Sequence, residues 1–189
     1  MTPRDTPLEH ALRGLIKVLD SLGALHCLLG ALALGAWAAP RTTQDVDVLL
    51  AVEPADRGRL LEALEAGGFA QDREWAEQNP MIRDVHLRFR YGPVAIDLMF
   101  PRGDHDRECL ARRRREAIGN LSVWVISPED LILHKLKAGR AQDFVDVLSV
   151  LHYQQNRLDQ PYLSHWAGRL GIQEELGYCV EQAARAAEG

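Results

Sequence analysis

The sequence predicts an α/β fold in which a small mixed β-sheet is flanked by helices and followed by a C-terminal helical tail. Short aliphatic runs of strand length alternate with segments of helical periodicity up to residue 126, and only helical patterns follow. The 189 residues are 47% hydrophobic and 26% charged, which suits one domain with a helical extension. We therefore expect a core over residues 1–126 and a helical region packed on it over residues 127–189.

The first half of the chain alternates between helix and strand patterns. Leucines at helical spacing indicate an N-terminal helix, which Gly23 can end. Pro40 ends a short helix that follows the first apolar run. The β-branched and aliphatic residues after Asp45 indicate a buried strand. The predicted ranges are a helix over 6–22, a strand over 25–29, a helix over 32–38, a strand over 45–52 and a helix over 53–67.

The second half begins with a polar segment over residues 69–80, for which we predict no regular structure. Two strand-like runs flank Gly92-Pro93 and predict a hairpin in which Arg88 faces Asp97. Ser127, followed by a proline and two acids, is a strong helix start. The other predicted elements are strands over 85–91, 94–100 and 121–126, a basic helix over 102–115, and helices after 127 and over 144–151, 162–170 and 173–187.

Two aspartates open the strand over residues 45–52. Residues i and i+2 of a strand point to the same face, so Asp45 and Asp47 lie side by side with their Cβ atoms about 6–7 Å apart. Carboxylates this close repel each other, which favours a cation between them. Hard oxygen ligands favour Mg²⁺ or a similar ion. The alternative is that Asp45 caps a turn and Asp47 lies at a strand edge.

A turn of small residues, Gly30-Ala31, precedes this pair by thirteen residues. The combination resembles the signature of the polymerase-beta-like nucleotidyltransferase superfamily, in which Gly followed by Gly or Ser leads, after such a spacer, to Asp-x-Asp or Asp-x-Glu. Ala33 and the stretch RTTQD over 41–45 are similar to the abortive-infection type (AbiEii-like) nucleotidyltransferase toxins and their uncharacterised relatives. Ala31 departs from the pattern: it loses a hydroxyl contact to phosphate and keeps the backbone N–H.

The resemblance implies a nucleotidyltransferase core that moves a nucleoside monophosphate from an NTP, such as ATP, to an acceptor with Mg²⁺ or Mn²⁺. Asp45 and Asp47 would bind the metal, and a third strand-borne carboxylate, Asp97, would complete the metal site and act as a base. The acceptor stays open among tRNA, a protein and a small molecule. A toxin role would imply an antitoxin partner. The residues that would bind the nucleotide are Gly30, Ala31, Arg41, Thr42, Thr43 and Lys135.

A second block, over residues 135–146, is also similar to these toxin-like enzymes. There the lysine, Lys135, is expected to face the nucleotide phosphates. Asp143 and Asp146 are spaced i,i+3 and therefore share a helix face. The alternative is an exposed Lys135 beside a salt-bridge network between two helices. The residues expected near the site or bracing it are Arg88, Arg140, Asp143 and Asp146.

Simpler roles are open for several of these residues. Gly30 can serve only to let a helix and a strand pack closely. Asp97 can form a structural salt bridge with Arg88, which faces it in the predicted hairpin. For the whole chain, the alternative is a non-catalytic nucleotide-binding or partner-binding module with a degenerate transferase site, and Ala31 favours this alternative.

The basic segment over residues 102–115 contains six arginines diluted by acids. If Arg112 to Arg115 lie on a helix, they point all ways round it and form no single stripe. One interpretation is a solvated helix with pairs such as Glu108 with Arg112. The other is a local patch for RNA or a nucleotide-bearing partner. Asp104-His105-Asp106 has metal-capable side chains without helical ligand spacing, so we leave it out of the predicted metal site.

Composition and hydropathy exclude several other classes of protein. No apolar run approaches the roughly 18–20 residues of a membrane span, and the first residues lack the apolar stretch of a signal peptide. We therefore expect no membrane partner and a cytoplasmic location. Three widely spaced cysteines indicate reduced thiols rather than a disulfide framework or a zinc site. A net charge of −5 argues against binding of a long polyanion over the whole surface.

Overall fold

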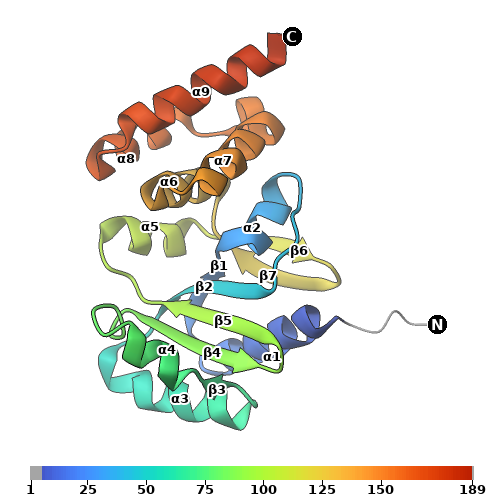
Figure 1. The fold of residues 1–189 in the computed structure, drawn as a ribbon, viewed down its shortest axis with the longest axis vertical. Helices are drawn as coiled ribbons and strands as arrows, with labels where there is room; N and C mark the ends of the chain where they lie inside the picture. The colour runs from blue at the N-terminus through green and yellow to red at the C-terminus, as the bar shows by residue number, and fades with distance from the viewer. Residues whose placement is uncertain (1–5, 189) are drawn as a thin grey trace, which may run out of the picture.

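The computed structural model describes residues 6–188 and has the predicted mixed α/β architecture (Figure 1). Residues 1–5, part of the predicted core, and residue 189 lie outside the described residues. The strands form one sheet in the order β3-β4-β5-β2-β1-β7-β6. Their bounds are β1 (Leu25–Leu28), β2 (Asp45–Ala51), β3 (Ala70–Gln71), β4 (His86–Tyr91), β5 (Val94–Met99), β6 (Arg114–Ile118) and β7 (Leu121–Val125).

Several helices begin at side chains that cap them. Thr6 and Glu9 form a capping box at the start of α1, and Ser127 accepts the N–H of Asp130 (3.1 Å) at the start of α6, as predicted. The helices are α1 (Pro7–Ser21), α2 (Gly30–Trp37), α3 (Arg57–Ala66), α4 (Arg73–Gln78), α5 (Asp104–Arg112), α6 (Pro128–Ala138), α7 (Ala141–Gln154), α8 (Gln160–Leu170) and α9 (Gln173–Glu188), with 3₁₀ turns at Pro54–Asp56 and Gln155–Arg157.

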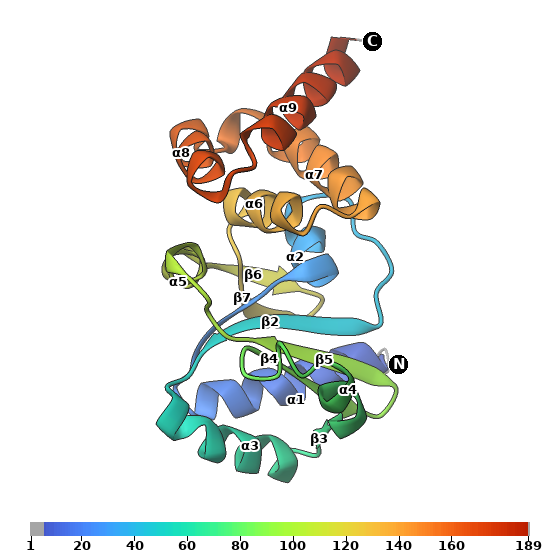
Figure 2. The ribbon, with the colours of Figure 1, turned by 60° about the vertical axis from the view of Figure 1, so that its left-hand side comes forward.

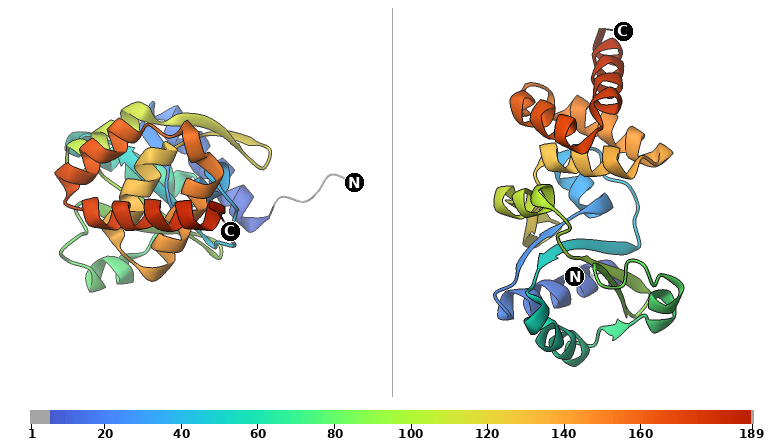
Figure 3. Two further views of the ribbon diagram at one scale, coloured as in Figure 1. Left: turned by 90° about the horizontal axis from the view of Figure 1, so that it is seen from above. Right: turned by 90° about the vertical axis from the view of Figure 1, so that its left-hand side faces the viewer.

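The molecule is layered along its long axis (Figures 1 and 2). α1 and α3 lie on one side of the sheet, and α2 and α5 lie on the other side, between the sheet and helices α6–α9. α6 packs against α7 and α8, and the end-on view in Figure 3 shows α9 lying across this last layer. Within residues 6–188, no helix is both long and apolar enough to cross a membrane.

The sheet register is the feature that positions the site. β2 and β5 are parallel, and Asp47 of β2 is paired with Asp97 of β5. β4 and β5 form the predicted hairpin, in which Tyr91 faces Val94 and Arg88 faces Asp97, so this predicted register is confirmed. Because Arg88, Asp97 and Asp47 lie on three neighbouring strands, one face of the sheet carries a row of charged side chains.

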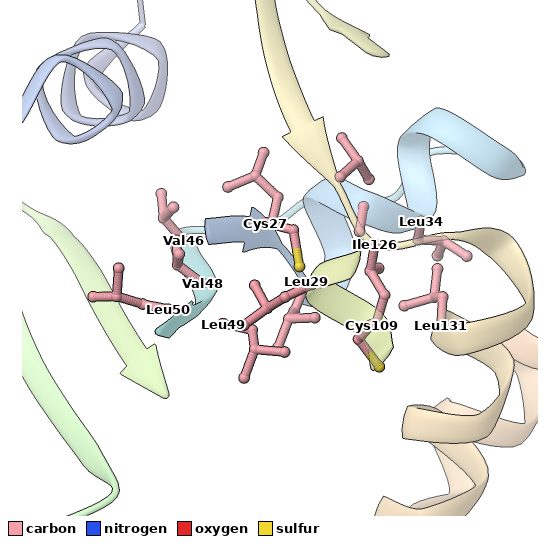
Figure 4. Packing of buried hydrophobic residues seen from close by; sticks show 14 of the residues in the cluster. Cys27, Leu29, Leu34, Val46, Val48, Leu49, Leu50, Cys109, Ile126 and Leu131 are labelled. Atoms are coloured by element: carbon pink, nitrogen blue, oxygen red, sulfur yellow. The ribbon is translucent and has the colours of Figure 1, made fainter. Parts of the chain in front are cut away.

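One hydrophobic cluster joins the sheet to the helices around it (Figure 4). It includes Val46 and Val48 of β2, Cys109 of α5 and Leu131 of α6. Since buried residues from both sides of residue 126 belong to this cluster, the two parts of the chain share one core. The boundary between the two predicted regions stays a prediction.

Residues 69–80, which we predicted to be irregular, contain β3 and α4. The Asp72 carboxylate caps α4 by accepting the N–H of Trp75 (3.1 Å). The prediction was wrong because it gave too little weight to this cap. A smaller difference concerns residues 53–67, where a 3₁₀ turn precedes α3.

The basic segment is also different from the prediction. Its helix, α5, ends at Arg112, and the arginines that follow enter strand β6, which pairs with β7 through a turn at Gly119 (φ +58°). Arg112 does not pair along its own helix: its Nη2 lies 3.3 Å from the Glu129 carboxylate of α6, and its guanidinium lies 3.7 Å from the centre of the Tyr162 ring. Tertiary contacts of this kind override a local helical pattern.

Candidate active site

β2 and β5 bring the three predicted aspartates together. Their parallel register puts Asp47 beside Asp97, and Asp45 lies two residues earlier, on the same face as Asp47. Neighbouring strands are about 4.8 Å apart, so the side chains of Asp47 and Asp97 are close neighbours. All three line a cavity of about 320 Å³, whose opposite wall is formed by α6 and the start of α7.

The cavity gathers most of the predicted site residues. Two further side chains that line it, His86 and His134, were not predicted. His86 lies on β4 two residues before Arg88, so strand alternation could have placed it on the same face. The predicted residues that line the cavity are Gly30, Asp45, Asp47, Arg88, Asp97, Lys135, Arg140 and Asp143.

The stretch after α2 does not line the cavity. Arg41 Nε lies 3.3 Å from the Asp146 carboxylate, which ties this stretch to α7. Thr42 is exposed, and the Thr43 hydroxyl donates a hydrogen bond to the Asp45 carboxylate. In this structure Arg41 and Thr43 contact acidic side chains rather than the cavity. Nucleotide binding by Arg41, Thr42 and Thr43 stays a prediction.

Gly30 begins α2 directly against the aspartates. Its φ of +61° lies in the left-handed region, and a Cβ at this position would lie 1.9 Å from Asp47 Oδ2. The N–H of Leu29 donates to the Asp47 carbonyl (2.8 Å), which fixes the turn against β2. Ala31 is buried and does not line the cavity. The first amides of α2 have no partner within the helix and are available to an anion.

Asp97 is held by a guanidinium and an imidazole from β4. Arg88 forms a bidentate ion pair with it (2.9 and 2.8 Å), and His86 Nε2 lies 2.7 Å from Asp97 Oδ1. Burial opposes ionisation of Asp97, but hydrogen bonds from His86 and Arg88 outweigh it and lower the pKa of this carboxyl. The salt bridge that we considered as an alternative is therefore present, and Asp97 stays ionised.

Asp47 has the opposite environment. Burial, followed by the charges of Asp45 and Asp97, raises its pKa from 3.8 to about 6. The two carboxylates on neighbouring strands thus differ in proton affinity because Arg88 and His86 contact only Asp97. A half-buried carboxylate that repels its neighbours is poised to accept a cation.

We expect Asp47→Asn to be more stable than the parent protein at about pH 8 in the presence of a chelator. The folded state holds the Asp47 proton more tightly than the unfolded state, so the folded parent loses stability as the pH rises from about 4 to about 6 and regains none above that range. The amide avoids this loss, which is about 2–3 kcal/mol at neutral pH. Urea unfolding of both proteins at several pH values measures the difference.

The control for this prediction is Asp45→Asn, which changes an exposed aspartate on the same strand. It removes one repelling charge and should give a smaller gain. The raised pKa predicts that the stability difference between Asp47→Asn and the parent changes with pH. An equal difference at about pH 4 and at about pH 8 would contradict it.

Lys135 is buried under α7 rather than exposed. Its Nζ donates to Asp143 (3.3 Å) and to Asp146 (2.5 Å), and Arg140 Nε donates to Asp143 (2.8 Å). The salt-bridge network between two helices is therefore present, and Lys135 is part of it. Because Lys135 also lines the cavity, contact with a nucleotide stays a prediction for this residue.

Two solved structures resemble this chain in overall fold. Lincosamide antibiotic adenylyltransferase LnuA, bound to lincomycin, has 12% identity, a TM-score of 0.52 and an alignment over 74% of this chain and 93% of that chain. ANT(2'')-Ia in complex with adenylyl-2''-tobramycin has 16% identity, a TM-score of 0.50 and an alignment over 93% and 94%. No curated protein matches the chain in sequence.

At these identities the similar structures show the fold alone, and this chain shares the fold of these two proteins. The closer likeness to abortive-infection toxins stays a prediction. A family model described as "Uncharacterised nucleotidyltransferase" matches residues 10–187. Because this match spans almost the whole chain, the protein belongs to that family of nucleotidyltransferases.

Proposed function

We propose that this chain transfers a nucleoside monophosphate, AMP in the first instance, from an NTP to a hydroxyl group of a small molecule, in a reaction that requires Mg²⁺. The observation that carries the proposal is the meeting of Gly30, Asp47 and Asp97 where α2, β2 and β5 converge. A helix N-terminus binds phosphate oxygens, and carboxylates beside it can hold the divalent cation that accompanies an NTP.

Asp45, Asp47 and Asp97 are the residues that would hold the metal. Their oxygens are hard ligands, and a cation would relieve the repulsion that raises the pKa of Asp47, so this donor set fits Mg²⁺ or Mn²⁺. A bound metal supplies charge stabilisation to the phosphoryl group during transfer. The backbone amides of Gly30 and Ala31 would bind phosphate oxygens, which requires no side-chain hydroxyl.

Asp97 would hold the acceptor in place from the same wall of the cavity as Asp47. Arg88 and His86 keep its carboxylate ionised and fixed. A carboxylate with a lowered pKa accepts a proton weakly. We therefore propose metal binding and orientation of the acceptor hydroxyl as its main roles, ahead of general base catalysis.

A small acceptor is favoured by the space beside Asp97. A second cavity, of about 270 Å³, shares His86, Met99 and His134 with the first. Its walls are largely apolar, with Arg102, Asp106 and Lys137 also contributing. The two similar structures named above are an antibiotic adenylyltransferase bound to lincomycin and a complex with adenylylated tobramycin, which supports ATP as donor and a hydroxylated small molecule as acceptor.

The contacts of the arginines in the basic segment make a nucleic-acid acceptor less favoured than a small molecule. Nη2 of Arg114 lies 3.5 Å from Glu129, and Arg113 and Arg115 lie over the Trp124 ring, 4.4 and 5.2 Å from its centre. Arginines that are already paired or stacked, on a chain with a net charge of −5, form a surface that binds a polyanion such as RNA only weakly. A tRNA or protein acceptor, a toxin role and an antitoxin partner therefore rank below the small-molecule acceptor.

The experiment that tests the proposal is transfer of label from each α-labelled NTP in Mg²⁺, with hydroxylated antibiotics, total tRNA and a protein extract as separate acceptors. We expect label from ATP on a small molecule and none after addition of a chelator. Label on tRNA or protein would overturn the small-molecule acceptor. Binding of NTP without transfer to any acceptor would favour the non-catalytic nucleotide-binding alternative.

A further inference from the structure

A cluster of nitrogen and sulfur ligands lies where α5 meets α6. His105 and Cys109 are one helical turn apart on α5, and His134 comes from α6. Each residue contributes one possible ligand atom, and these three atoms all lie within 4.8 Å of one another. His105 and Cys109 are buried, and Figure 4 shows Cys109 in the core with Leu131 of α6. Neither cysteine spacing nor the Asp-His-Asp triplet in the sequence indicates this grouping.

Both imidazoles of the cluster have a carboxylate at Nε2. His105 Nε2 lies 3.1 Å from Asp130 Oδ1, and His134 Nε2 lies 3.3 Å from Asp106 Oδ1. This leaves Nδ1 of each ring for another ligand. Both ring nitrogens of His105 lie 3.8 Å from Cys109 Sγ. Histidines that bind metals almost always have the other ring nitrogen hydrogen-bonded, as Nε2 of His105 is to Asp130; for His134, Asp106 lies near Nε2.

The present contacts do not satisfy the cluster completely. Within the described residues, the buried Nε2 of His134 makes no hydrogen bond of acceptable geometry, although Asp106 is near. Nitrogen and sulfur ligands of a tetrahedral zinc site lie about 3.4–3.7 Å apart, given Zn–N and Zn–S bonds of about 2.0–2.3 Å. The separation of 3.8 Å between His105 and Cys109 is already close to this value.

We propose that His105, Cys109 and His134 form a zinc site, with two imidazole nitrogens and one thiolate as protein ligands. Binding releases the Cys109 thiol proton to solvent and forms the Zn–S bond. This ligand set is softer than the all-oxygen set of the aspartates, so the two sites select different metals. Since α5 contacts β1 and β2 while α6 belongs to the last helical layer, the zinc ion ties that layer to the sheet.

The test is a Co²⁺ titration of the full chain after removal of metals with a chelator and dialysis. Four-coordinate cobalt with a thiolate ligand gives a sulfur-to-cobalt charge-transfer band and intense visible bands, which oxygen ligands alone do not give. We expect both to saturate at an equimolar amount of Co²⁺, to vanish on addition of Zn²⁺, and to persist in Asp47→Asn. Absence of the charge-transfer band from the parent protein would overturn the proposal.

The matched variants are Cys109→Ser and Cys179→Ser, because both cysteines are buried and only Cys109 lies in the cluster. Cys109→Ser should lose the charge-transfer band and the thermal stabilisation by Zn²⁺, whereas Cys179→Ser should keep both. If Cys109→Ser does not fold, His134→Asn, at a partly exposed position, should bind Co²⁺ at least about 10-fold more weakly. An unchanged cobalt affinity of His134→Asn, or a band that persists in Cys109→Ser, overturns the assignment.

Discussion

The Asp47→Asn variant should transfer nucleotide at least about 10³-fold more slowly than the parent protein, which corresponds to about 4 kcal/mol of lost transition-state stabilisation. Asp47 is at the centre of the candidate site, with Asp97 on the neighbouring strand and Gly30 against its carboxylate. Asparagine keeps the shape of the side chain and removes the charge that a metal ion requires. The measurement is the initial rate of label transfer from ATP to the best acceptor.

The control for this variant is Asp56→Asn, which removes the same charge from an exposed 3₁₀ turn. We expect its transfer rate to stay within about twofold of the parent rate. Unfolding cannot explain a loss in Asp47→Asn, because we expect that variant to be the more stable protein without metal. A parent-like rate in Asp47→Asn would remove the aspartates from the proposed mechanism.

Gly30→Ala should cost about 2–4 kcal/mol of folding stability and lower transfer by about 100-fold or more. Two separate effects add at this position. An alanine with φ near +61° is strained, and its Cβ would lie 1.9 Å from Asp47 Oδ2, so the aspartate must move. The free energy of unfolding in urea measures the first quantity, and the label-transfer rate of the folded protein measures the second.

Gly23→Ala separates the two effects. Gly23 has nearly the same backbone conformation, with a φ of +63°, but a Cβ there would meet nothing within 4 Å. It should cost only the backbone strain of about 1–2 kcal/mol and leave the transfer rate unchanged. If both alanine variants lose stability equally and both keep their activity, Gly30 has no part in the site.

The hairpin and the aspartate pair could be predicted because local rules fix them. A two-residue loop determines which residues of a hairpin face each other, so Arg88 opposite Asp97 followed from Gly92-Pro93 alone. Strand alternation likewise placed Asp45 and Asp47 on one face. The place of Asp97 near the aspartate pair is a long-range contact, and its prediction came from the family resemblance rather than from any local pattern. The parallel pairing of β2 with β5 that produces this contact was not predicted.

Other features depend on tertiary contacts that no local pattern reveals. At the end of α5, Arg112 pairs with Glu129 and stacks on Tyr162, both of which are distant in sequence. Burial of Lys135 depends on α7 folding over it, so the same lysine in an isolated helix would be exposed. The grouping of His134 with Cys109 likewise requires α5 and α6 to pack together.

The position of β1 in the sheet has a consequence for folding. β1 pairs with its neighbour in sequence, β2, but its other edge is covered only by β7, where Leu28 meets Val125. Pairing over so long a stretch of chain is slow, because the entropy of loop closure must be overcome before the contact stabilises anything. Until β7 has been synthesised, an emerging chain therefore exposes a central strand edge, the kind of surface that aggregates and that chaperones protect.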